Sequence, residues 1–204
     1  MELISKDYKL ALNQVDLSFE ALYIENIFAL RKDITVEERL EHNKYIKYKS
    51  TIEKKYPHLL GQKIGDFLLE LKNSGDPYYH NFLNCHGDKR YCRFKFVNEE
   101  LFKRRGLYFF SIGDNISDIK YIGRCLDNFN KRINIGYGDL DPENCYKKGQ
   151  STNCRLNNLV LEHKDVIRLF LVPLDEDDDY IKTAETELKS FLRLKLGLKL
   201  WNIR

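Results

Sequence analysis

Residues 106–124 read Gly-Leu-Tyr-Phe-Phe-Ser-Ile-Gly-Asp-Asn-Ile-Ser-Asp-Ile-Lys-Tyr-Ile-Gly-Arg, and this stretch decides the fold. Strand-forming residues flank Gly113-Asp114-Asn115, and those three residues have turn chemistry. The stretch therefore predicts a β-hairpin. Its two strands place the phenols of Tyr108 and Tyr121 near one another.

A short helix is expected after the hairpin. Asp127 is a suitable N-cap residue, which puts Arg132 on that helix beside the two strands. Tyr137 would reach the same place only if Gly136 ended the helix. The sequence thus predicts an arginine next to the two phenols.

A second helix is expected over residues 181–192. Its apolar residues are spaced to bury one face, and they are Ile181, Ala184, Leu188, Phe191 and Leu192. Glu185 lies within this apolar stripe, whereas Glu187 points to the opposite side. A carboxylate in a buried stripe costs several kcal/mol unless cations or donors compensate it. Glu185 therefore needs a charged or hydrogen-bonding partner.

These elements, in this order, resemble the GIY-YIG nuclease family. The resemblance covers residues from about 104 to 204 and rests on several short motifs in the order of the family. They are Gly106-Leu107-Tyr108, Tyr121-Ile122-Gly123, the Arg132 helix, the Glu185 helix and the closing Trp201-Asn202. Leu107 replaces the usual isoleucine. The His or Tyr often found one helical turn after the arginine is Gly136 here, which leaves the role of Tyr137 open.

The resemblance implies a metal-dependent endonuclease. Glu185 would bind one divalent cation, Mg²⁺ or alternatively Mn²⁺, because Mg²⁺ accepts a single carboxylate together with phosphate oxygens. Arg132 would clamp the scissile phosphate through its fixed fork of donors. Tyr108 would act as general base, and Tyr121 would orient water or phosphate.

A free phenol has a pKa of about 10, so a base role for Tyr108 requires nearby cations that favour phenolate. Lys120, Arg124 and Arg132 are the candidates, with Lys120 counted among the catalytic residues and Arg124 among those that contact DNA. The resemblance also implies Tyr137 as a catalytic residue. It implies three structural residues, which are Gly106, Gly123 and Asn202.

Two further segments predict contacts with double-stranded DNA. Residues 44–55 hold five lysines against one acid, with tyrosines between them, and the lysines are Lys44, Lys47, Lys49, Lys54 and Lys55. Such a stripe can neutralise phosphates, and the alternative is a solvated helix face with half-buried tyrosines. A polar helix start suits phosphate and base contacts, with capping as the alternative. Its residues are Gln150, Ser151, Thr152, Asn153 and Arg155.

The expected fold class is α+β, a small antiparallel sheet flanked by helices, with a helical N-terminal extension over residues 1–90 and a nuclease domain over 91–204. Residues 1–72 suggest helices, and Asn73-Ser74-Gly75-Asp76-Pro77 is a clear break. Residues 91–97 alternate as a half-buried strand, and residues 165–172 read as a strand buried on both faces.

Composition limits the alternatives. The chain has 204 residues with a net charge of +3, and its hydrophobic content of 43% and charged content of 32% are typical of globular proteins. No segment has the length and composition of a membrane span or a secretory signal, so a cytoplasmic location is expected. Five cysteines without a disulfide spacing suggest reduced thiols, and no zinc site is expected. The absence of a P-loop argues against a nucleotide cofactor.

The function that fits best is a type II restriction endonuclease making double-strand breaks at a short symmetric site. One site cuts one strand, so a homodimer is expected, at least on DNA. Apolar residues of the extension could form its interface or pack internally, and they are Phe19, Leu22, Ile27, Phe28 and Leu30. The alternatives are a structure-specific repair or homing-type nuclease, and a DNA-binding module without activity.

Overall fold

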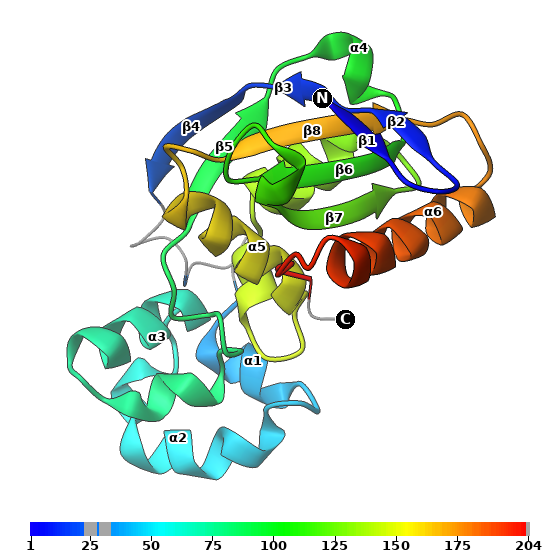
Figure 1. The fold of residues 1–204 in the computed structure, drawn as a ribbon. Helices are drawn as coiled ribbons and strands as arrows, with labels where there is room; N and C mark the ends of the chain where they lie inside the picture. Colours follow the sequence, from blue (N-terminus) through cyan, green and yellow to red (C-terminus); the bar gives the residue numbers. More distant parts are fainter. Residues whose placement is uncertain (23–27, 29–33, 203–204) are drawn as a thin grey trace. The chain divides into compact units, whose positions relative to one another are not determined.

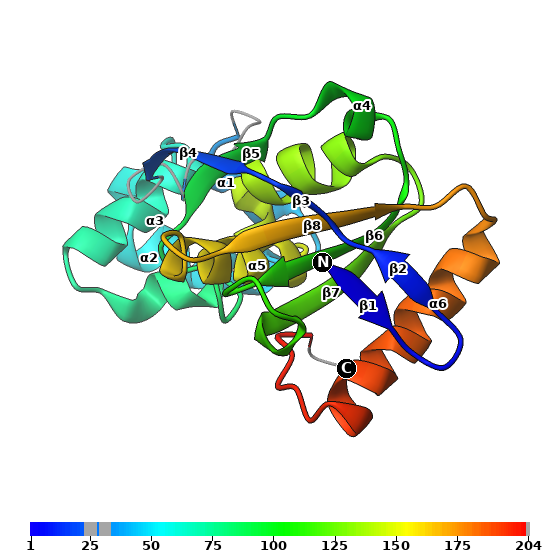
Figure 2. The ribbon, with the colours of Figure 1, turned by 45° about the horizontal axis from the view of Figure 1, so that its top comes forward.

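A four-stranded antiparallel sheet carries the hairpin predicted from residues 106–124. The computed structural model describes residues 1–22, 28 and 34–202 and belongs to the α+β class. The strand order is β3 (Asn13–Val15), β8 (Arg168–Pro173), β6 (Gly106–Ser111) and β7 (Ile119–Cys125). Figures 1 and 2 show the four strands side by side, with β7 at one edge.

The hairpin is confirmed, and its register explains its sequence. All six residues of β6 are buried, because β6 lies between β7 and β8 in the sheet. Tyr108 lies opposite Gly123, and Phe110 lies opposite Tyr121. Gly106 has a φ of +139°, and a Cβ at this residue would lie 2.1 Å from the carbonyl oxygen of Val172. A glycine is therefore required where β6 begins.

The chain forms two compact units. Unit 1 comprises Met1–Glu20, Arg93–Asp139 and Leu159–Arg204, and unit 2 comprises Ala21–Cys92 and Leu140–Asn158. The chain passes from unit 2 to unit 1 between Cys92 and Arg93, near the boundary expected at residue 90. The first 20 residues lie in the same unit as the hairpin, and residues 140–158 lie in unit 2.

Unit 1 adds short strands and helices around the four-stranded sheet. A two-stranded sheet pairs β1 (Glu2–Ile4) with β2 (Lys9–Ala11), and another pairs β4 (Leu17–Leu22) with β5 (Cys92–Phe96), whose residues 21, 22 and 92 belong to unit 2. The helices include α4 (Glu99–Phe102), η4 (Ile116–Asp118), η5 (Asn130–Gly138), α6 (Asp178–Ser190) and η7 (Phe191–Lys195). Helix α6 packs on β6 and β7, as Figure 2 shows. One face of the hairpin thus meets the buried stripe of α6.

Unit 2 is mostly helical around an aromatic core. Its elements include α1 (Val36–Glu41), η1 (Ile46–Tyr48), α2 (Lys49–Lys55), η2 (Pro57–Leu59), α3 (Ile64–Asn73), η3 (Pro77–Asn81) and η6 (Pro142–Cys145). Helix α5 (Ser151–Glu162) begins in unit 2. Helix α1 begins after Thr35, where Thr35 and Glu38 form a capping box. The break before Pro77 is confirmed, with Gly75 at a φ of +75°.

The expectation that residues 1–72 are helical was wrong for the first 22 residues, which contain β1 to β4. Each of the first three strands has three residues, and Leu3 and Leu10 point inward between exposed neighbours. These strands are too short for their two-residue period to be distinguished from helical spacing. They gain their stability by pairing with other strands rather than from local propensity.

Two apolar residues of the extension, Phe19 and Phe28, pack inside the units. Phe28 is 1% exposed in the core of unit 2. Phe19 is half-buried, and its ring centroid lies 6.0 Å from that of Phe94. Ile27 and Leu30, and the side chain of Leu22, lie outside the described residues. Phe19 and Phe28 thus follow the alternative, internal packing.

The cysteines differ from expectation at one pair. Cys145 and Cys154 form a disulfide, so the interpretation of all five as reduced thiols was wrong. Cys85, Cys92 and Cys125 are free thiols. Among the described residues, no helix has the length and apolar character needed to cross a membrane.

Candidate active site

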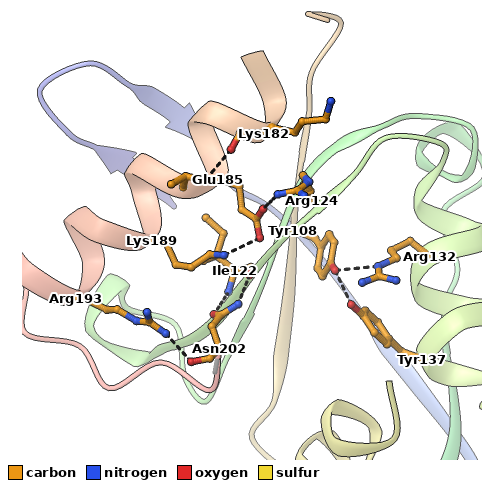
Figure 3. A network of polar contacts seen from close by, with 11 residues as sticks. Tyr108, Ile122, Arg124, Arg132, Tyr137, Lys182, Glu185, Lys189, Arg193 and Asn202 are labelled. Carbon is orange, nitrogen blue, oxygen red and sulfur yellow. Dashed lines mark hydrogen bonds and ion pairs between the residues drawn. The ribbon is translucent and has the colours of Figure 1, made fainter. Parts of the chain in front are cut away.

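Two phenols and an arginine form a hydrogen-bonded cluster against the hairpin. The hydroxyl groups of Tyr108 and Tyr137 lie 2.6 Å apart, and Arg132 Nε donates to the Tyr108 hydroxyl at 3.2 Å. The guanidinium of Arg132 lies 4.7 Å from the centre of the Tyr137 ring. Figure 3 shows the three side chains converging on the Tyr108 oxygen. Both phenols are fully buried.

Gly123 leaves the space that the Tyr108 ring occupies. A Cβ at Gly123 would lie 2.3 Å from both Cζ and the hydroxyl oxygen of Tyr108. The ring of Tyr108 therefore lies over the backbone of the opposite strand. The packing of Tyr108, the tyrosine of the first tripeptide, thus requires Gly123, the glycine of the second.

The helix that carries Arg132 and Tyr137 has π geometry. Element η5 is a π-helix over Asn130–Gly138, and Asp139 N donates to Asn134 O five residues earlier at 2.6 Å. Five-residue turns bring Arg132 and Tyr137 onto one face. Tyr137 thus reaches the site although Gly136 lies inside the helix, so the expectation that Gly136 must end it was wrong.

The start of this helix also differs from expectation. Asn128, rather than Asp127, accepts a hydrogen bond from Lys131 N through its side chain, at 2.8 Å. The Asp127 carboxylate instead pairs with the Lys131 ammonium group. At the other end of η5, a Cβ on Gly138 would lie 1.8 Å from Phe94 O, so only glycine permits this approach to β5.

Burial raises the pKa of Tyr108 well above its ordinary value, and the Tyr121 phenol raises it further, whereas Arg132 lowers it by less. Burial likewise raises the pKa of Tyr137, with Tyr108 adding to the shift. In the free protein Arg132 thus favours the phenolate of Tyr108, as expected of a neighbouring cation, but burial outweighs it. Both phenols are neutral hydrogen-bonding groups at neutral pH.

Tyr121 lies beside this cluster on β7, whereas Lys120, its neighbour on the strand, points to the opposite face of the sheet. The ring of Tyr121 stacks on that of Tyr108 with centroids 6.1 Å apart, and Tyr121 is 7% exposed. Lys120 is half-buried, and its carbonyl accepts a hydrogen bond from Trp201 N at 2.5 Å. The two expected phenols are thus brought together, while Lys120 contacts Trp201 through its main chain.

Glu185 is buried on α6 and is held by two cations. It is 6% exposed, Arg124 Nη1 contacts its Oε2, and Lys189 Nζ lies 3.1 Å from its Oε1. The prediction that this carboxylate requires partners is confirmed. Arg124, which was expected to contact DNA, binds Glu185 in this structure. Lys189 was missed, although its spacing of four residues from Glu185 is a recognisable ion-pair signal.

The phenol cluster and Glu185 lie on opposite faces of the sheet. Residues alternate between the faces along β6 and β7, and Leu107 and Ile122 pack into the same core as α6. Arg124 lies opposite Leu107, one residue from the Tyr108–Gly123 pair. Arg124 comes from the edge strand β7 and Tyr108 from its neighbour β6, so the two groups of side chains lie on either face of the same strand pair.

Asn202 binds the backbone of this edge strand. Its Oδ1 accepts from Ile122 N at 3.1 Å, and its Nδ2 donates to Ile122 O at 2.7 Å. Arg193 Nη2 donates to the carbonyl of Asn202 at 2.5 Å. The neighbouring Trp201 stacks on His163 with ring centroids 5.3 Å apart. The structural role expected for Asn202 thus has a physical basis.

Two other asparagines bind β5 in the same way, and the sequence did not indicate them. Asn157 accepts from Cys92 N at 3.0 Å and donates to Cys92 O at 2.7 Å. Asn134 accepts from Phe96 N at 3.0 Å and donates to Phe96 O at 3.1 Å. Each amide satisfies both main-chain groups of one strand residue.

The lysine stripe lies on the surface of unit 2. Lys49 pairs with Glu41, and Lys55 Nζ lies 3.0 Å from Asp76 Oδ2. Lys44, Lys47 and Lys54 are exposed. The tyrosines between them do not form a binding surface, because Tyr45 and Tyr56 are buried in the core and Tyr48 packs against it.

The polar start of α5 is divided between surface and interior. Gln150, Ser151 and Thr152 are exposed and Arg155 is half-buried. Asn153 is only 5% exposed, and its Nδ2 donates to Gln150 Oε1 at 3.0 Å. The Asn153 side chain thus makes a local hydrogen bond within unit 2.

The donor set fits one kind of metal site. Among the described residues, no group of three or more His, Cys, Asp and Glu side chains could form a cage for a cation. Of the acidic side chains that the structure describes, Glu185 is the buried one, and it supplies a hard oxygen donor on α6. This fits Mg²⁺ held by one carboxylate and completed by phosphate oxygens and water. No protein-family model matches the chain, and neither does any curated protein or solved structure.

Proposed function

We propose that the chain is a metal-dependent endonuclease that hydrolyses phosphodiester bonds in DNA. The observation that carries the proposal is that a buried phenol–arginine cluster and a buried glutamate lie on the two faces of the β6–β7 strand pair. A pair of phenols with an arginine suits a phosphate, because the guanidinium binds phosphate oxygens in a fixed geometry. The order of these residues along the chain, which resembles that of GIY-YIG nucleases, adds support.

Arg132 would hold the scissile phosphate. Its Nε already donates to Tyr108, which fixes the plane of the guanidinium. The N–H groups on its two Nη atoms would then donate hydrogen bonds to the phosphate oxygens and stabilise charge in the transition state. Lysine lacks this planar fork of donors, so the Arg132→Lys variant should not cleave DNA.

Tyr108 would orient the attacking water. In the free protein its hydroxyl is neutral and shares a hydrogen bond with Tyr137. It could take a proton from water only once bound substrate and cation lower its pKa, and Tyr137 could then steady the phenolate by donating to it. A cation bound to Glu185 would neutralise charge at the phosphate and lower the pKa of its own water.

Within this class we propose a type II restriction enzyme that acts on double-stranded DNA as a homodimer, at least on the DNA. The exposed lysines of unit 2 support DNA binding, because such groups neutralise phosphates. One active site per chain would cut one strand, so two copies would make a double-strand break. Two-fold symmetry would then give a symmetric recognition site.

The test is plasmid cleavage in Mg²⁺ followed by sequencing of the ends. Wild type should give discrete fragments that share one short symmetric sequence. Glu185→Gln should lose more than the 10–100-fold typical of groups that only support a ligand. Glu187→Gln is the matched control, because Glu187 is exposed on the same helix. Nicks at branched or random positions would point to a repair-type nuclease, and intact plasmid would point to a binding module.

A further inference from the structure

Both oxygens of Glu185 are paired with cations, which bears on when a metal can bind. Arg124 contacts Oε2 and Lys189 contacts Oε1 at 3.1 Å. Two positive groups surround one negative group, so the local sum of charges is positive. A divalent cation that approached this arrangement would be repelled. In the free protein the carboxylate is therefore closed to the metal that the donor set otherwise fits.

The two cations differ in how easily they can leave. Lys189 lies four residues after Glu185 on the same helix and its side chain is 20% exposed. Arg124 comes from the edge strand and its side chain is 41% exposed. The guanidinium of Arg124 thus faces solvent at the edge that the proposed substrate would approach. Phosphate offers it a bidentate partner at least as suitable as a carboxylate.

We infer that Arg124 blocks Glu185 in the free protein and leaves it for a backbone phosphate when DNA binds, so that metal binding depends on DNA. The inference rests on the proposed function and extends it to the order of binding. Exchange of one anion for another keeps Arg124 paired. It leaves Glu185 Oε2 available next to a phosphate, whose negative charge cancels the net positive charge of Glu185, Arg124 and Lys189, so that a dication is no longer repelled. Arg124 is thus a positioning residue that acts through Glu185.

The first test measures Mn²⁺ binding to the free protein by electron paramagnetic resonance, without DNA or turnover. Wild type should bind Mn²⁺ weakly, and Arg124→Gln should bind it about tenfold more tightly or better, within the range of ordinary coupling energies. Arg124→Lys keeps a cation beside Glu185 and should behave as wild type. The double variant Arg124→Gln with Glu185→Gln should lose the gain. Thermal unfolding checks that each variant is folded.

The second test follows the Arg124 Nε–H resonance by NMR in EDTA while a short DNA duplex is added. A shift of this resonance in wild type, with no metal present, is expected if the guanidinium moves to phosphate. The inference is overturned if Arg124→Gln binds Mn²⁺ no better than wild type, if the gain survives loss of Glu185, or if duplex leaves the resonance unchanged. Failure of the nuclease proposal is a separate result, since it is read from intact plasmid.

Discussion

At the scale of single residues, the ring of Tyr108 occupies the space that a side chain on Gly123 would need. The phenol lies where any side chain on Gly123 would have to be, with atoms only 2.3 Å from the Cβ position. The same ring contributes the hydroxyl that joins Arg132 to Tyr137. A change at Gly123 would therefore disturb the candidate site without touching any polar atom.

Gly123→Ala should destabilise the protein by about 1–3 kcal/mol, the usual cost of an overpacked core, and should abolish cleavage because the phenol is displaced. Urea unfolding and plasmid cleavage measure the two effects. Gly61→Ala is the control, since nothing lies within 4 Å of the Cβ position at Gly61. Equal effects of the two substitutions would contradict the steric explanation.

The buried phenols also predict how stability depends on pH. The pKa of Tyr108 is raised in the folded state, so an unfolded chain releases its phenol proton at lower pH than the folded one. This contribution is present below about pH 10, the unfolded value, and is lost as pH rises towards the folded pKa. Urea unfolding should therefore show the free energy of unfolding falling as the pH rises above about 10. Tyr108→Phe should reduce the slope, and an unchanged slope would contradict the assignment.

At the scale of elements, the π-helix determines which side chains meet. Arg132 and Tyr137 are five residues apart, a spacing that an α-helix would not place on one face as well as a spacing of four. Ile135 lies between them and is 51% exposed. The helix thus accommodates one more residue than an α-helical turn, and the tyrosine still reaches Tyr108.

Deletion of Ile135 should convert this turn to α geometry, with the tyrosine four residues after Arg132 and on the same face. Cleavage should fall by no more than about tenfold, and stability should change by less than about 1.5 kcal/mol, because no buried group is removed. Insertion of an alanine after Ile135 is the matched control and should abolish cleavage by turning the tyrosine away. If deletion is as damaging as insertion, the five-residue turn is itself required.

The elements that the sequence predicted are those with a long, regular pattern. The hairpin, the buried stripe with Glu185 on α6, and the alternation of β5 were predicted correctly because each spans several periods. The strands of residues 2–22 were missed because they are short and are stabilised by pairing rather than by local pattern. The asparagines that bind β5 were missed because the sequence around a polar residue does not show which backbone groups its side chain will bind.

At the scale of the whole molecule, DNA binding by unit 2 predicts a salt effect. Replacing exposed Lys44 and Lys47 with glutamine should reduce the slope of log affinity against log salt by about 0.9 for each lost phosphate contact. Lys55→Gln is the control, because its ammonium group already pairs with Asp76. Fluorescence anisotropy with a DNA duplex at several salt concentrations gives the slopes. An unchanged slope in the double variant would show that these lysines belong to an ordinary solvated surface and do not contact phosphate.

The contacts of residues 201 and 202 with β7 have a consequence for solubility. The outer edge of a sheet presents unpaired N–H and C=O groups that can recruit a strand from another molecule. Here Trp201 N and the Asn202 amide occupy that edge at Lys120 and Ile122. A chain that ended before Trp201 would expose a strand template of aromatic and aliphatic residues. Such a truncation would favour aggregation by edge-to-edge sheet growth, even where the rest of the fold is kept.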